Sequence, residues 1–161
     1  PAVRFDECLS GGDAKRGERI FRDSDAACLR CHTLGGDDRK DLAGPNLGDI
    51  GKRQNRVYIL ESIVDPNKVV APGYLRELLV TEDRNFEAKI LAENEKEIEA
   101  EIIRDGEPEK IKIATSAILS RKRGISAMPQ DVAKDLSRAD IRDVVEFLAT
   151  HLEFEKKKTG H

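Results

Sequence analysis

The sequence is poor in aromatic residues and contains no long apolar run. Its 161 residues include five Phe, two Tyr and no Trp. No apolar stretch reaches the roughly 20 residues of a membrane-spanning helix, so we expect no span in this chain. The formal net charge is only −3, which gives no electrostatic case for binding nucleic acid. The length suits one domain, and the scarcity of aromatic residues leaves its core with little apolar bulk.

Cysteine is scarce too, yet two of the three cysteines lie in one five-residue stretch, Cys28-Leu29-Arg30-Cys31-His32. Two thiols three positions apart can form thioether bonds to the vinyl groups of a haem, and the histidine that follows can ligate the iron. The spacing therefore predicts one c-type haem, covalently attached through Cys28 and Cys31, with His32 as an iron ligand.

Two other interpretations of this stretch lack supporting residues. A structural zinc site needs a second pair of ligands, but Cys8, His151 and His161 are scattered singly. A thioredoxin-like redox motif follows a strand, and residues 21–27 do not form an apolar run of that kind. The remaining cysteine, Cys8, has apolar neighbours, so we expect a partly buried thiol, with pairing to another chain as the alternative.

Capping residues and apolar periodicity predict three helices. They run from about residue 14 to 22, 55 to 64 and 137 to 151, and Asp13, Asn55 and Ser137 stand at their starts. A glycine inside the first helix, Gly17, indicates either a close helix crossing or a tolerated glycine.

Between the second and third helices the pattern changes to strand-like alternation. Apolar residues alternate with Glu and Lys across residues 75–121, and Asp105-Gly106 is a strong turn signal. We predict a small antiparallel meander with a charged outer face, and we find no catalytic constellation in it.

The single methionine, Met128, precedes a proline in a predicted loop. A thioether can be an axial haem ligand, so Met128 is the best candidate opposite His32, and His151 is its main competitor. The loop at 44–48 contains Gly-Pro, and either it presents a carbonyl to the second nitrogen of the ligating imidazole or it is an ordinary turn.

Taken together, these motifs resemble those of a class I cytochrome c. The shared features, in the same order, are Gly17 and Phe21, the motif at 28–32, the loop at 44–47, Met128-Pro129, and Phe147 with Leu148. The resemblance implies that the first and last helices cross at Gly17 and Phe21, that the carbonyl of Pro45 holds the His32 ring, and that Leu47 contacts the haem.

More narrowly, the chain is similar to the haem-binding domain at the C-terminus of large planctomycete and verrucomicrobial proteins. That similarity rests on residues 8–14, 60–67 and 126–129 and on the strand insertion, and it covers about residues 5–152. It implies a mainly α fold, a class I cytochrome c helical fold around one haem. We expect one domain over 1–161, with a helical haem core at about 11–74 and 122–152, an inserted β-meander at about 75–121 and a charged tail at 153–161.

These residues predict an electron-transfer protein rather than an enzyme. With His32 and Met128 on the two sides of the iron, no position is open for a substrate. We expect a transient contact with a redox partner protein or a fused dehydrogenase domain. Arg53 is the candidate for a haem propionate, and the basic run at 121–123 either steers an acidic partner or is ordinary solvated surface.

Two alternatives belong to other functional classes. An open or labile sixth position would suit peroxidase-like chemistry or gas sensing, and a docking role for the meander would make the haem chiefly structural. Because covalent haem is attached outside the bacterial cytoplasm, we predict a periplasmic or other extracytoplasmic location. The sequence starts with Pro1 and shows no signal peptide, so we expect a mature or excised chain.

Overall fold

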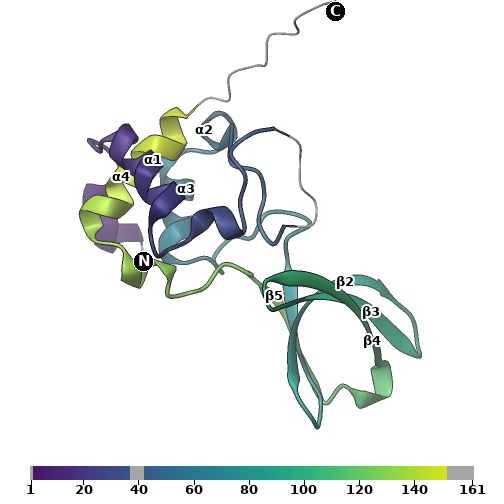
Figure 1. Ribbon diagram of the computed structural model, residues 1–161. Coiled ribbons are helices and arrows are strands. Elements are labelled where there is room, and N and C mark those ends of the chain that lie inside the picture. The colour runs from purple at the N-terminus through teal and green to yellow at the C-terminus, as the bar shows by residue number, and fades with distance from the viewer. Residues whose placement is uncertain (1, 37–41, 152–161) are drawn as a thin grey trace, which may run out of the picture.

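In the computed structural model, which describes residues 2–36 and 42–151, helices and strands occupy separate parts of the molecule (Figure 1). The described residues form four α-helices and one five-stranded antiparallel sheet, which is a mixed α/β architecture. The predicted mainly α, class I cytochrome c helical fold is therefore wrong. The charged stretches that we predicted as a small insertion form a five-stranded sheet with a core of its own. The predicted tail at 153–161 lies outside the described residues.

The helical part contains the predicted helices with their predicted caps. Its α-helices are α1 (Ala14–Asp23), α2 (Ile50–Arg53), α3 (Arg56–Val64) and α4 (Arg138–Thr150), joined by the short 3-10 turns η1 (Ala2–Cys8), η2 (Cys28–Arg30) and η4 (Val132–Asp135). Asp13 accepts hydrogen bonds from two backbone N–H groups of α1, and Asn55 accepts one from α3. Ser137 and Asp140 form a reciprocal capping box at the start of α4.

Helices α1 and α4 cross in direct backbone contact at Gly17. A Cβ added there would lie 1.9 Å from the carbonyl oxygen of Asp143, so no other side chain fits without moving α4. One turn further, the rings of Phe21 and Phe147 pack with centroids 5.9 Å apart. The predicted crossing of the first and last helices is confirmed. The same helices are tied by the buried carboxylate of Asp143, which pairs with Arg16.

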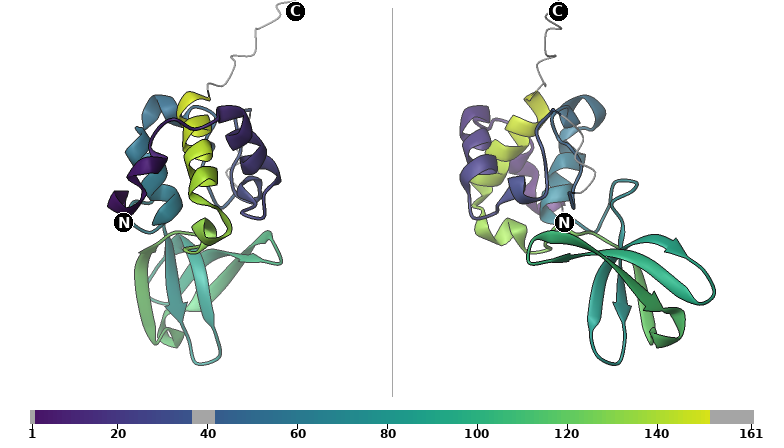
Figure 2. Two further views of the ribbon diagram at one scale, coloured as in Figure 1. Left: turned by 90° about the vertical axis from the view of Figure 1, so that its left-hand side faces the viewer. Right: turned by 45° about the vertical axis from the view of Figure 1, so that its right-hand side comes forward.

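The strands form one sheet in the order β4-β3-β2-β1-β5. Its members are β1 (Arg76–Val80), β2 (Asn85–Glu93), β3 (Glu97–Arg104), β4 (Glu107–Ala114) and β5 (Ser120–Ile125), and the turn η3 (Thr115–Ala117) precedes β5. The inward face buries a core separate from that of the helices: Leu79, Ala88, Ile98, Ala100, Ile102 and Ile113. Figure 2 shows the curved sheet lying beyond one end of the helical part in both views.

The last strand, β5, corrects the predicted boundary of the insertion. We placed residues from 122 onward in the helical core, but β5 pairs with β1 along its length, from Ser120 opposite Val80 to Ile125 opposite Arg76. Three consecutive basic residues, 121–123, give β5 no alternation of apolar and polar side chains, which is the pattern that predicts a strand. They are compatible with it because β5 is an edge strand with mostly exposed side chains.

A membrane span is also absent from the described residues, since none of their helices combines enough length with enough apolar character to cross a bilayer.

Candidate functional site

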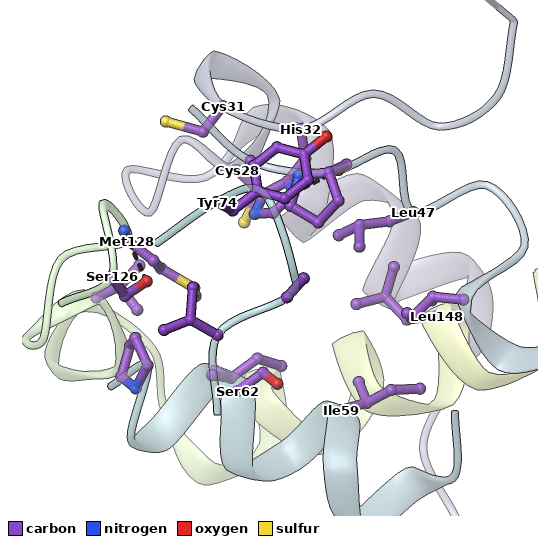
Figure 3. Close-up of a pocket in the computed structure, with 18 of the residues that line it drawn as sticks. Cys28, Cys31, His32, Leu47, Ile59, Ser62, Tyr74, Ser126, Met128 and Leu148 are labelled. Atoms are coloured by element: carbon purple, nitrogen blue, oxygen red, sulfur yellow. Dashed lines mark hydrogen bonds between the residues drawn. The ribbon is translucent and has the colours of Figure 1, made fainter. Parts of the chain in front are cut away.

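A largely apolar pocket of about 260 Å³ lies in the helical part, between α3, α4 and the segments around η2 (Figure 3). The residues predicted to hold the haem all line it, apart from the competing ligand His151: Cys28, Cys31, His32, Pro45, Leu47, Arg53 and Met128. Aliphatic side chains from α3 and α4, among them Ile59, Ile63, Val144 and Leu148, form much of the remaining wall. Residues as far apart in the sequence as Cys28 and Leu148 thus meet at one cavity.

The cysteine motif sits on a tight turn. Ala27 adopts a left-handed backbone conformation with φ of 50°, and the N–H groups of Cys31 and His32 both donate to the carbonyl of Cys28, at 3.2 and 3.0 Å. Figure 3 shows Cys28, Cys31 and His32 together along one side of the pocket. The turn therefore brings two thiols and one imidazole to the same wall. Neither thiol is in a disulfide.

Burial raises the pKa of both thiols. For Cys31 the positive charges of Arg76 and Arg30 act in the opposite direction. Both side chains are accordingly neutral thiols at neutral pH, and both line the pocket.

The imidazole of His32 is fixed through one nitrogen. Its Nδ1 lies 2.8 Å from the carbonyl oxygen of Pro45, so Nδ1–H donates and Nε2 keeps its lone pair. This confirms the predicted contact with Pro45. Burial lowers the pKa of His32, and the bond to Pro45 opposes that shift, so the ring favours the neutral, ligating form.

The loop that carries Pro45 is itself pinned. A Cβ at Gly44 would lie 2.5 Å from Cε1 of His32, so only glycine lets the chain pass this close to the ring. The side-chain oxygen of Asn46 accepts from the N–H groups of Gly35 and Gly48, at 2.9 and 2.8 Å. Asn46 thereby holds the two ends of the loop together around the Pro45 carbonyl.

The methionine approaches from a different segment. Met128 lies in the loop after β5 and lines the pocket on a side different from that of Leu47 and Leu148 (Figure 3). Its competitor, His151, packs instead against the ring of Phe147, with centroids 4.9 Å apart, and does not line the pocket. Between the two candidates, the fold brings Met128 to the cavity.

Arg53 lines the pocket but already has partners. Its Nε donates to Asp49 at 2.8 Å, and its Nη2 donates to the carbonyl of Asn46 at 3.0 Å. A contact between Arg53 and a propionate stays a prediction, and it would compete with these two bonds.

Several residues of the site escaped the sequence analysis. Tyr58, Ser62 and Tyr74 line the pocket, and the nearly buried Arg76 lies beside Cys31 at the start of β1. Ser62 lies four residues after Tyr58 and three after Ile59, a spacing that places all three on one face of α3 and was a weak signal for a polar group facing the pocket. Nothing in the sequence around Arg76 distinguishes it from the exposed charges of the other strands.

The donor groups suit a covalent haem better than a bare metal ion. Two thiols, one neutral imidazole and one thioether line an apolar cavity. In a covalent haem the thiols would bond to the two vinyl groups, and the imidazole and the thioether would ligate the iron. Among residues 2–36 and 42–151, no cluster of three or more His, Cys, Asp or Glu could hold a metal ion. The residues present therefore fit a haem attached at Cys28 and Cys31.

A comparison with models of known protein families gives no match to this chain, and a comparison with curated proteins gives none either.

Proposed function

We propose that this chain binds one c-type haem covalently and transfers single electrons. Cys28 and Cys31 would hold the haem by thioether bonds, and His32 and Met128 would ligate its iron. The haem, when bound, supplies an iron that changes its charge by one electron.

The observation that supports this proposal most strongly is the meeting of four residues at one apolar cavity. Cys28, Cys31 and His32 come from a single turn, whereas Met128 follows the whole sheet in the sequence. If the Cys-x-x-Cys-His motif had arisen by chance, there would be no reason for the only methionine of the chain to line the same pocket.

The surrounding residues have supporting roles in this proposal. The carbonyl of Pro45 holds the imidazole ring in place and selects its Nε2 as the ligand atom. The aliphatic side chains of α3 and α4 exclude water, which keeps the environment of the iron similar in both oxidation states. Two protein ligands leave no site for a substrate, so we propose a carrier or relay rather than an enzyme.

The partner and the location follow from this chemistry. We propose a transient contact with a redox protein or with a dehydrogenase-like domain of the same polypeptide, since small, weak interfaces suit electron transfer. Covalent attachment of haem implies a periplasmic or other extracytoplasmic location.

The test is a visible spectrum of the protein produced together with the haem-attachment machinery. We expect covalently bound haem, and in the oxidised protein a methionine-to-iron charge-transfer band at the red end of the spectrum. Met128→Ala should abolish the band but keep the haem, and Cys28→Ala/Cys31→Ala should abolish covalent attachment.

Two results would contradict this proposal. A wild-type protein without covalent haem would exclude the cofactor. Rapid binding of cyanide or carbon monoxide at neutral pH would instead indicate an open sixth position, as peroxidase-like chemistry or gas sensing requires.

A further inference from the structure

The two segments that connect the helical part to the sheet both line the pocket. The first follows α3 and includes Pro66 and Tyr74, and the second follows β5 and includes Ser126 and Met128. All five strands lie between these segments in the sequence. The position of the methionine therefore depends on where the chain returns from the sheet.

One side chain joins the two connecting segments directly. The N–H of Ser126 donates to the side-chain oxygen of Asn67 at 2.6 Å, across 59 positions of sequence. Asn67 follows Pro66, which is buried and lines the pocket, so its own position is set by the end of α3.

A second hydrogen bond continues from Ser126 to the methionine. The N–H of Met128 donates to the hydroxyl oxygen of Ser126 at 3.1 Å. Asn67, Ser126 and Met128 thus form a chain of two hydrogen bonds that ends at the backbone of the candidate ligand.

We infer that Asn67 is a positioning residue that holds the Met128 loop against the pocket, through Ser126, and so keeps the thioether in place to ligate a haem iron. This inference rests on the proposed function. Asn46 acts in the same way near His32, where its side-chain oxygen also accepts hydrogen bonds from the backbone and holds the Pro45 loop in place.

The inference is tested on the haem-loaded protein by competition with added imidazole, which displaces a weakly held methionine. Asn67→Leu removes the acceptor, and losing one hydrogen bond should raise the affinity for imidazole roughly two- to tenfold. Amide hydrogen exchange at Ser126 should become faster in the same variant. Asn67→Asp keeps an acceptor oxygen and should behave like the wild type in both measurements.

Two further variants complete the design. Ser126→Ala removes only the second hydrogen bond, so it should raise the affinity for imidazole even if Asn67→Leu does not fold. The matched control is Asn94→Leu, because Asn94 accepts from the N–H groups of Lys96 and Glu97 in a turn of the sheet, away from the pocket. It should leave the affinity for imidazole unchanged.

The results separate this inference from the proposed function. Wild-type affinity in both Asn67→Leu and Ser126→Ala would overturn the role of Asn67 while the red band of the wild type still supported methionine ligation. An Asn67→Asp variant that behaves like Asn67→Leu would also overturn it. A wild type that lacks the band and binds imidazole as tightly as Met128→Ala does would overturn both.

Discussion

The helical part and the sheet are stabilised in different ways. The helices meet in backbone contact at Gly17, are tied by paired charges such as Arg16 with Asp143, and leave a pocket between them. The sheet closes over its own aliphatic core, and none of its core residues lines that pocket. Substitutions in the core of the sheet should therefore leave the pocket unchanged, and substitutions in the pocket should leave the sheet unchanged, except at the two connecting segments.

The largest expected effect comes from filling the helix crossing. Gly17→Val would place a branched side chain where the carbonyl of Asp143 lies 1.9 Å from a Cβ position. We expect the free energy of unfolding, measured by urea denaturation, to fall by about 3 kcal/mol, the upper end of the usual cost of overpacking. A variant that kept wild-type stability would show that α1 and α4 do not cross as described.

Two matched substitutions of smaller effect, one in each hydrophobic core, compare the helical part with the sheet directly. Ile98→Val in the sheet and Ile59→Val in α3 each remove one methylene from a buried side chain, at a cost of about 1 kcal/mol. Because Ile59 lines the pocket and Ile98 does not, we expect only Ile59→Val to change the affinity of the haem-loaded protein for imidazole. An equal change in both variants would mean that the two cores behave as one unit.

The smallest effect concerns pH. The hydrogen bond from Arg56 lowers the pKa of Glu146 in α4, and burial opposes that shift. The stabilisation is therefore complete at neutral pH and is lost as the pH falls below the ordinary carboxyl value toward the lower folded value. In Glu146→Gln this part of the acid sensitivity should disappear, at a cost below about 1 kcal/mol at neutral pH. Urea denaturation at several pH values would measure it, and an unchanged acid slope would contradict it.

The sequence was most informative where a local rule acts. Asp13, Asn55 and Ser137 cap their helices as predicted, because a cap involves only the next few residues. Gly17 by itself left a close helix crossing and a tolerated glycine open, and its contact with the backbone of α4 is what establishes the crossing. The fold class was wrong because the extent of a sheet depends on pairing between distant strands, and β5 carries no alternating pattern of its own.

The same division holds at the candidate site. By itself the sequence determined the motif at 28–32 as a unit, since five consecutive residues on one turn carry both thiols and the imidazole. Only the tertiary structure shows which of the two candidate ligands reaches the cavity: Met128 lines it, whereas His151 packs against the ring of Phe147. It also revealed the hydrogen bond from Ser126 to Asn67, which joins segments that only folding brings together.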